Sequence, residues 1–410
     1  MSEHPATTIL RDLIRCPSVT PAEGGAIAYL AERLERLGFA CHRLTFGGGD
    51  TPEVENLYAR LGTAAPNVCF AGHTDVVPVG DANAWSAAPF GGEVRANEQG
   101  KPEMFGRGAV DMKGGIAAFV AAVESYLASA EPQGSISLLI TGDEEGPAVA
   151  GTFKVLEWLR ERGEVLDACL LGEPTNPDTL GDAIKIGRRG SVSGTLTVRG
   201  VQGHAAYPHL ADNAVRGVVK LATALMDPPF DGGTEHFEPS NLEVTSIDVG
   251  NPATNVVPAR ATAGFNVRFN DTWDADTVRA EIERRLDVAA HDESLRPAPR
   301  LGPNAGEVRP PVDWSVSWRD RPSHVFLTRD DRLIAAVSDA VEAVTGRRPA
   351  LSTGGGTSDA RFIKDACPVV EFGLVGRTMH QVDERVAIAD LERLAAIYER
   401  FLQTMLGAAS

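Results

Sequence analysis

The sequence predicts an α/β protein whose catalytic domain is interrupted by a smaller α+β domain. The chain has 410 residues, whereas a single domain usually contains ~150 residues. Its first third alternates apolar runs with helical patterns, which is typical of a layered domain with a mostly parallel sheet. Near Lys185 this changes to the alternation of half-exposed antiparallel strands. We therefore expect a catalytic domain formed by residues 1–186 and 327–410, with residues 187–326 inserted as a separate domain.

The first segment shows the strand and helix signals of the catalytic domain. Apolar residues at helical spacing, ended by Gly38, predict a helix over residues 21–37. Short apolar runs bounded by turn residues predict buried strands at 67–70, 135–141 and 166–171. Helices are expected between these strands, at 116–130 and 152–162.

The inserted segment repeats a strand and helix theme with a different pattern. Strands are predicted at 190–200, 242–249 and 261–269, and helices at 213–226 and 275–288. The alternation of apolar and polar residues predicts a sheet with one open face. Residues 295–311 are rich in Pro, Gly and Arg and are expected to form a loop, and residues 332–410 return to helix, strand and helix.

Composition and charge exclude several classes of protein. The formal net charge of −17 disfavours binding to nucleic acid. No apolar run approaches the ~18 residues of a membrane span, and the first residues lack the pattern of a signal peptide. Five scattered cysteines without a CxxC pair are typical of reduced thiols. We therefore expect a cytoplasmic enzyme without a membrane partner.

Polar residues that suit metal chemistry follow the predicted strands. His73 and Asp75 lie two apart in GHTDVVP, so that on a continuing strand both would share one face, with Asp75 orienting His73 as a ligand. Asp111 is the only acid of GRGAVDMKGG and could bridge two cations. Taken singly, a polar turn or a helix-capping aspartate would explain these residues as well.

Three further acids and a late histidine complete the pattern. Glu144 and Glu145 follow a strand in ITGDEEG, where one could bind metal while the other faces the substrate. Glu173 ends an apolar run in LLGEPT, and His380 lies in GRTMHQVDE near the C-terminus. A solvated acidic loop and a lone loop histidine are the alternatives. Open α/β sheets place ligand sites at strand ends, so the joint pattern favours a catalytic zinc site with nitrogen and oxygen ligands.

Competing catalytic motifs are absent from the sequence. It contains no G-x-S-x-G elbow, no P-loop and no H-E-x-x-H motif.

In the inserted segment, Arg188 and Arg189 would suit an anionic substrate, and His204 could donate to a developing oxyanion. Surface or packing roles remain open for these residues. Asn255 and Arg268 are further polar candidates, and the backbone of the glycine-rich loop 352–362 could receive a carboxylate.

The motifs together resemble the dizinc deacylase and aminopeptidase superfamily, and within it the succinyl-diaminopimelate desuccinylase family. The segments that carry this resemblance run over nearly the whole chain: GHTDVVP, GRGAVDMKGG, TGDEEG, GEPT, GRRGS, GHAAYPH, STGGGTSDARF and the late His380. The resemblance implies a zinc-aminopeptidase-like catalytic domain and an inserted lid domain that forms a homodimer. It also implies two Zn2+ per subunit, which Co2+ can replace.

The resemblance further implies a role for each matched residue. His73, Asp111 and Glu173 would hold one zinc, and His380, Asp111 and Glu145 the other. Glu144 would be the general base, Asp75 would orient His73, and His204 would reach the active site of the partner subunit. Substrate binding would involve Arg188, Ser191, Tyr207, Asn255, Arg268, Gly355 and Thr357. A cis peptide bond is expected after Asp111.

The implied reaction is hydrolysis of N-succinyl-LL-2,6-diaminopimelate to succinate and LL-2,6-diaminopimelate, a step of lysine and cell-wall precursor synthesis. Two alternatives remain at this point. Acetylornithine deacetylase or another N-acyl-amino-acid deacylase would share the metal ligands, and a non-catalytic metal- or peptide-binding protein could share the fold. Relative to the family pattern, the chain carries extra stretches near 97–103 and 295–311, both expected to be loops.

Overall fold

The computed structural model describes residues 3–292, 310–319 and 322–407. It divides into two compact units, which are described separately below. The first comprises Met1–Gly187, Leu327–Ser352 and Ser358–Ser410, and the second comprises Arg188–Phe326 and Thr353–Thr357. The chain passes between the units at the two-residue strands β9 (Gly187–Arg188) and β16 (Phe326–Leu327). The loop Thr353–Thr357 belongs to the second unit, although the sequence analysis placed it with residues 327–410.

The first unit is built on a mixed sheet of eight strands in the order β1-β2-β6-β3-β7-β18-β8-β17. Their bounds are β1 Ala40–Gly48, β2 Thr51–Leu61, β3 Asn67–His73, β6 Ser135–Thr141, β7 Ala168–Leu171, β8 Ala183–Lys185, β17 Ala350–Ser352 and β18 Val369–Glu371. The pairs around β3 are parallel, whereas β1, β2 and β6 pair in antiparallel fashion. Every residue of β3 and β6 is buried, which explains their nearly continuous apolar sequence.

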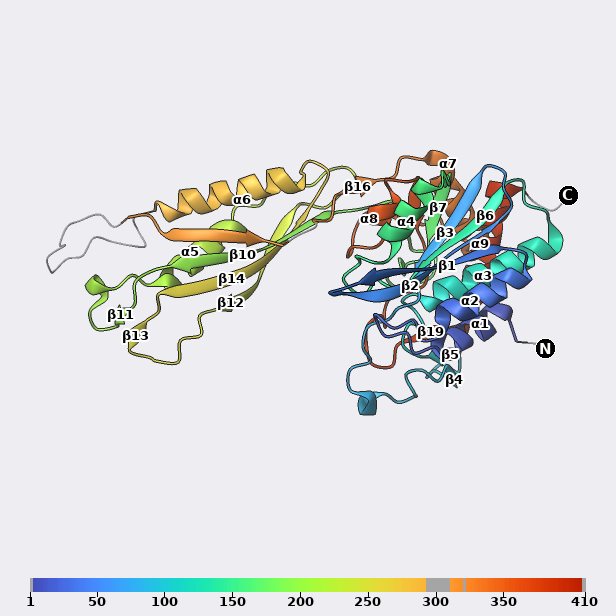
Figure 1. Ribbon diagram of the computed structural model, residues 1–410, viewed down its shortest axis with the longest axis horizontal. Helices are drawn as coiled ribbons and strands as arrows, with labels where there is room; N and C mark the ends of the chain where they lie inside the picture. Colours follow the sequence, from blue (N-terminus) through green and yellow to red (C-terminus); the bar gives the residue numbers. More distant parts are fainter. Residues whose placement is uncertain (1–2, 293–309, 320–321, 408–410) are drawn as a thin grey trace. The chain divides into compact units, whose positions relative to one another are not determined.

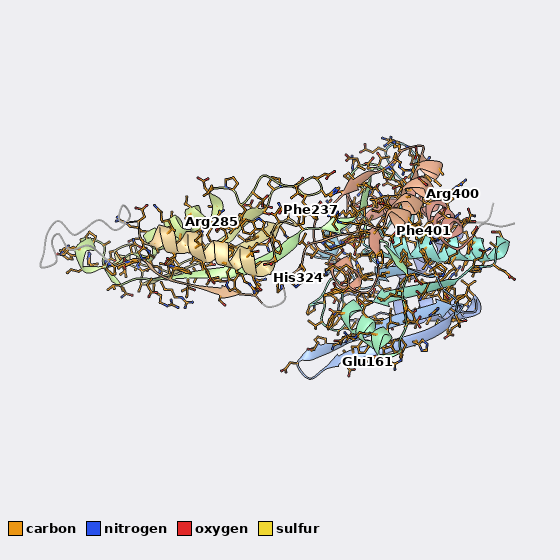
Figure 2. The ribbon with its side chains drawn as sticks, turned by 90° about the horizontal axis from the view of Figure 1, so that it is seen from above. Glu161, Phe237, Arg285, His324, Arg400 and Phe401 are labelled. Atoms are coloured by element: carbon orange, nitrogen blue, oxygen red, sulfur yellow. The ribbon has the colours of Figure 1, made fainter. Side chains whose placement is uncertain are left out.

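Helices cover both faces of this sheet (Figure 1). Their bounds are α1 Pro5–Ile14, α2 Ala26–Arg36, α3 Lys113–Ser129, α4 Thr152–Glu161, α7 Asp331–Thr345, α8 Ala360–Ile363 and α9 Ile388–Leu406. Helices α1, α3 and α9 pack against one another, while α4 packs against β6 and α8. In the core, the rings of Phe70 and Phe119 stack at 4.2 Å, and Tyr398 meets both rings edge-on. Phe401 of α9 belongs to the same core (Figure 2).

A three-stranded sheet in the order β19-β5-β4 accompanies the first unit. Its strands are β4 Glu93–Ala96, β5 Pro102–Phe105 and β19 Arg385–Ala387. The side chain of Asn97 accepts hydrogen bonds from the backbone of Gln99 and Lys101, which closes the turn between β4 and β5. The stretch 97–103, expected to be a loop, therefore ends within strand β5.

The second unit contains an antiparallel sheet of four strands in the order β12-β14-β10-β15. Its elements are β10 Gly190–Arg199, β11 Gly203–His204, α5 Ala214–Met226, β12 Asn241–Asp248, β13 Val256–Val257, β14 Arg260–Phe269, α6 Ala275–Ala290 and β15 Asp313–Trp318. Helices α5 and α6 lie over one face of the sheet, where alternate strand residues form a separate core (Figure 1). Arg285 of α6 ties the two helices together by donating to the carbonyls of Leu225 and Pro228 at the end of α5 (Figure 2).

Several predicted elements differ from the structure in physically understandable ways. The helix predicted over 21–37 begins only at Ala26, because Pro21–Gly25 form a turn. The helix predicted from residue 116 begins at Lys113, so that Gly114 and Gly115 lie inside it. A Cβ on Gly115 would lie 2.4 Å from the carbonyl oxygen of Gly172, so this glycine lets the helix approach the chain after β7. Of the loop predicted at 295–311, residues 295–309 lie outside the described residues. No helix in the described part of the chain is both long and apolar enough to cross a membrane.

Candidate active site

The predicted metal ligands converge at one edge of the eight-stranded sheet. Strands β6, β3 and β7 are neighbours and run parallel, so their carboxyl ends meet. His73 is the last residue of β3, Glu144 and Glu145 follow β6, and Glu173 follows β7. Two loops complete the set with Asp111, just before α3, and His380, between β18 and β19. The sheet therefore explains why residues from distant motifs share one site.

The distances within this cluster are those of direct contacts. Nε2 of His73 lies 3.1 Å from Oδ1 of Asp111 and 3.7 Å from Oε1 of Glu173. Nε2 of His380 lies 3.2 Å from Oδ2 of Asp111 and 2.7 Å from Oε1 of Glu145. Asp111 thus contacts both histidines, one with each carboxylate oxygen. His380 adopts a left-handed backbone conformation, with φ 61°, which is uncommon for a residue with a side chain.

The donor set fits divalent metal ions. Two groups of ligand atoms lie within 4.8 Å of one another, His73 with Asp111 and Glu145, and His73 with Glu144 and Glu173. Both consist of imidazole nitrogens and carboxylate oxygens without cysteine, which is typical of catalytic zinc sites. Several carboxylates this close repel one another, and cations would offset that repulsion. The structure adds Glu144 to one group, whereas the sequence analysis assigned it to the base alone.

Asp75 contacts both His73 and the backbone of the glutamate pair. Its carboxylate accepts hydrogen bonds from the backbone N–H groups of Glu144 and Glu145, at 3.2 and 3.0 Å. Nδ1 of His73 lies 2.9 Å from the carbonyl oxygen of Asp75 and 3.6 Å from its Oδ1. The backbone carbonyl of Asp75 is thus nearer to the imidazole than its carboxylate, which also holds the pair of glutamates. That the Asp75 side chain orients His73 stays a prediction.

Burial and mutual contacts shift the pKa values of the acids and histidines in this cluster. Burial alone would lower the pKa of His73, but the hydrogen bond to Asp111 and the charge of Glu173 raise it well above its ordinary value. Hydrogen bonds to Asp111 and Glu145 raise the pKa of His380 to about 10. Burial raises the pKa of Glu144 well above its ordinary range, and the neighbouring Glu173 adds to this effect. Burial likewise raises the pKa of Asp75 to about 6.

Metal binding is therefore expected to release protons at neutral pH, because ligation needs neutral imidazoles and the neighbouring carboxylates raise the pKa of both histidines. Since the pKa of His380 is about 10, protons compete with metal throughout the neutral range, and the apparent affinity should rise with pH. Titration calorimetry of Zn2+ in buffers of different ionisation enthalpy measures the release. His380→Gln should release one proton fewer, whereas His42→Gln, outside the site, should match the native protein. A binding enthalpy independent of the buffer would contradict this expectation.

The residues predicted to bind substrate belong to the second unit. Arg268 of β14 lies opposite Ser191 of β10 and Asn241 of β12. Burial and the nearby charges of Arg189 and Arg188 lower the pKa of Arg268. Among the described residues, no hydrogen bond or ion pair reaches the guanidinium of Arg268, whereas Nη1 of Arg188 donates to the carbonyl of Gly356 at 2.6 Å. Three arginines thus form a local positive cluster, next to the loop that holds Gly355 and Thr357.

A second group of candidates lies around the short strands β11 and β13. His204 ends β11, and the backbone N–H of Ala205 donates to the carbonyl of Asn255. Nδ1 of His204 accepts a hydrogen bond from the backbone N–H of Ala206 at 3.0 Å, which leaves Nε2 as the ring's donor atom. The ring of Tyr207 lies 5.5 Å from that of His204, and both side chains are exposed.

Two buried acids that the sequence analysis did not single out also belong to the site. The Asp143 carboxylate accepts hydrogen bonds from the backbone N–H groups of Ala148, Val149 and Ala150, and so holds the loop that follows the glutamate pair. Glu384 accepts backbone hydrogen bonds from the loop that carries Asp111. Both acids stand inside the motifs TGDEEG and GRTMHQVDE. In the sequence, each is only an acidic residue near a predicted ligand. The sequence alone does not distinguish such a buried acid from a solvent-exposed one.

Solved structures of other proteins have the same fold as this chain. An M20 family metallo-carboxypeptidase, Sso-CP2, from Sulfolobus solfataricus matches with TM-score 0.75 and 18% identity over 99% of each chain. Human carnosine dipeptidase 1 matches with TM-score 0.71 and 21% identity, over 98% of this chain and 95% of its own. The Bacillus subtilis YXEP protein, a dinuclear metal-binding peptidase of the M20 family, has TM-score 0.67 and 15% identity, over 98% and 97%. At these identities the likeness establishes the fold alone.

The sequence itself carries the family assignment. Residues 69–404 match the peptidase family M20/M25/M40, and this range includes every predicted metal ligand. The α/β fold with its mixed central sheet agrees with that match. The chain therefore belongs to peptidase family M20/M25/M40 and is an enzyme of this metallo-hydrolase family.

Proposed function

We propose that the enzyme hydrolyses N-succinyl-LL-2,6-diaminopimelate to succinate and LL-2,6-diaminopimelate. The proposal places the catalytic chemistry on the histidine and carboxylate cluster of the first unit and substrate recognition on the arginines of the second. The substrate carries three carboxylates, so a site for it needs cationic groups in a protein of net charge −17. We further propose that the enzyme acts in the cytoplasm, where its five free cysteines would stay reduced.

In this proposal, His73, Asp111 and Glu173 hold one zinc ion, and His380, Asp111 and Glu145 hold the other, with cobalt as a possible replacement. The two ions would supply Lewis acidity to the amide carbonyl and make a nearby water more acidic. Asp111 is suited to the shared position because its two oxygens already face different histidines. Asp75 holds the backbone of Glu144 and Glu145, so that these adjacent side chains keep different directions.

Glu144 is the proposed general base. Burial raises its pKa above the ordinary range of a glutamate, which favours its role as a proton acceptor. It takes a proton from the attacking water as oxygen bonds to the amide carbon, and the C–N bond then breaks. The proton returns to the leaving nitrogen. The acyl group departs as a carboxylate, and the second proton of the water passes to the amine, which leaves as an ammonium ion. His204 would donate a hydrogen bond from Nε2 to the developing oxyanion.

The observation that carries the choice of substrate is the Arg268 guanidinium. It is partly buried and repelled by Arg188 and Arg189, and it contacts no carboxylate among the described residues. A buried cation without an anion is unfavourable, so its presence indicates an anionic ligand. A succinyl carboxylate would meet that need, whereas the acetyl group of acetylornithine carries no such charge. Several solved structures with this fold are described as peptidases, so the test of this choice needs a panel of substrates that includes peptides.

The decisive assay compares hydrolysis of N-succinyl-LL-2,6-diaminopimelate, N-acetylornithine and simple dipeptides by the same zinc-loaded preparation. The succinylated substrate should have the highest kcat/KM. Preference for N-acetylornithine would identify a different deacylase with the same metal ligands, and preference for dipeptides would identify a peptidase. Two metal ions per chain without hydrolysis of any substrate would instead favour a binding protein on this fold.

Arg268→Ala is expected to raise KM for the succinylated substrate by about 10- to 100-fold, because a charged hydrogen bond to the ligand is lost. The KM for a neutral acyl-amino acid should change little. Arg260→Ala is the matched control, since Arg260 lies on the same strand β14 and is exposed. Steady-state kinetics on both substrates measures the effect. An equal change for both substrates would assign Arg268 to the packing of the sheet.

A further inference from the structure

The carboxylate of Glu384 is buried and contacts four donors of one loop. Its Oε2 accepts hydrogen bonds from Nη1 of Arg107 at 2.8 Å and from the backbone N–H of Gly108 at 2.9 Å. Its Oε1 accepts from the backbone N–H groups of Val110 at 2.9 Å and Asp111 at 3.2 Å. Glu384 is 0% exposed, so water does not compete for these hydrogen bonds. Charge-assisted bonds of this kind are stronger than neutral ones, and four of them converge here.

The loop has the backbone shape that this convergence requires. Gly108 adopts φ 82°, and a Cβ at this position would lie 2.7 Å from Cγ1 of Val76. A side chain is therefore disfavoured here, and the left-handed conformation helps to turn the N–H groups of Gly108, Val110 and Asp111 toward one point. The point is occupied by the Glu384 carboxylate. The geometry of the loop and the acid are thus matched to each other.

The same residue joins the loop of Asp111 to the segment of His380. Glu384 lies four residues after His380 and 273 positions after Asp111. Its own carbonyl oxygen accepts a hydrogen bond from the backbone N–H of Gly106 at 2.9 Å, so both the main chain and the side chain contact the loop. The following strand β19 then pairs with β5, which leads into that loop. Glu384 thus holds together the two segments that carry His380 and Asp111. Nε2 of His380 lies 3.2 Å from Oδ2 of Asp111.

We propose that Glu384 is a positioning residue that fixes the separation of Asp111 and His380 and thereby sets the affinity of the metal centre. It would touch neither metal nor substrate and would act through the backbone of Gly108–Asp111. The inference rests on the proposed assignment of Asp111 and His380 as ligands, but not on the identity of the substrate. Residues that orient metal ligands typically change metal affinity by about 10- to 100-fold when replaced.

Glu384→Gln tests the proposal, because the amide keeps the size of the side chain but replaces one acceptor oxygen by a donor. Arg107 would then be a buried cation without its partner, which could destabilise the fold by itself. The double variant Glu384→Gln/Arg107→Met removes that charge and separates the two effects. Glu103→Gln is the matched control, because Glu103 pairs with Arg385 at 3.0 Å on the neighbouring strand and does not contact the loop.

The test needs four measurements on the full chain. Zinc dissociation constants come from competition with a chromophoric chelator, the ligand geometry from the visible absorption of the cobalt-loaded protein, backbone exposure from hydrogen exchange of the metal-free protein, and stability from the melting temperature. Glu384→Gln and the double variant should both bind zinc about 10- to 100-fold more weakly. Both should also show an altered cobalt spectrum and faster exchange at residues 107–112. The double variant should melt at a higher temperature than Glu384→Gln. Glu103→Gln should match the native protein in every measurement.

Native zinc affinity in the double variant would overturn the proposal, because Glu384 would then only balance the charge of Arg107. A double variant that does not fold even with zinc would also overturn it, by assigning Glu384 to stability. A native protein that binds two zinc ions but hydrolyses no succinylated substrate would contradict the proposed function and leave this test intact. A native protein that binds no zinc would overturn both.

Discussion

Replacing Glu144 with glutamine is expected to lower kcat by at least ~10²-fold, the usual effect of removing a general base. Glutamine has the same shape but cannot accept the proton of the attacking water. The backbone hydrogen bond from residue 144 to Asp75 does not depend on the side chain, so the glutamate pair should keep its geometry. Metal analysis of the purified variant should still find two ions per chain. Turnover near the native value would show that another group accepts the proton.

Glu145→Gln provides the matched comparison, because the two glutamates are adjacent and both are held by Asp75. Oε1 of Glu145 lies 2.7 Å from Nε2 of His380, whereas Glu144 belongs to the group with His73 and Glu173. Glu145→Gln should therefore reduce the occupancy of one metal position, and added zinc should restore part of its activity. Added zinc should not rescue Glu144→Gln. If the two variants behaved alike, the division of roles between them would be wrong.

A mixed dimer of His204→Ala and Glu144→Gln chains is expected to recover about half of the native activity, although each parent homodimer is nearly inactive. If His204 acts in the active site of the partner subunit, one site of the mixed dimer has both groups intact and the other has neither. The imidazole would stabilise charge that develops only in the transition state, so His204→Ala should lower kcat more than it raises KM. Steady-state rates of the purified mixed dimer measure the recovery.

The experiment requires co-expression of the two variants with separate affinity tags and isolation of the doubly tagged species. The control mixes His204→Ala with His209→Ala, because His209 lies nearby in the same unit and is not a proposed catalytic group. That dimer should retain one site with an intact His204. A mixed dimer of the first pair that stays as inactive as its parents would confine His204 to its own chain. Failure to isolate any mixed species would contradict the prediction that the protein forms a dimer.

Much of the fold could be predicted because burial leaves a strong pattern. Strands β3 and β6 are buried on every residue, and their apolar runs ended where His73 and the glutamates begin. Helix boundaries were less accurate. Gly114 and Gly115 disfavour a helix locally, yet both lie inside α3, where a Cβ on Gly114 would meet the carbonyl oxygen of Ala109 and a Cβ on Gly115 that of Gly172, each at 2.4 Å. Such tertiary requirements are absent from a local sequence pattern.

The ligands of the candidate site could be predicted, but the residues that hold these ligands in place were harder to predict. Motif spacing brought His73, Asp111 and His380 into one hypothesis, and the structure places them in contact. The H-x-D spacing did not reveal that the backbone carbonyl of Asp75 lies nearer to the imidazole of His73 than the Asp75 carboxylate does. Glu384 was overlooked for a related reason. Its partners are backbone N–H groups, and these have no signature in the sequence.

The two units have separate hydrophobic cores, and none of the residues that the structure describes belongs to both. Substitutions that share no packing partners usually add in their effects on stability. During evolution, residues such as Arg268 could therefore change without disturbing the packing behind β3 and α3. Under the proposed division of roles, a lineage could exchange one acyl preference for another by substitutions in the second unit while the first kept its ligands unaltered. The split of the chain into two cores would then let substrate recognition change independently of the catalytic residues.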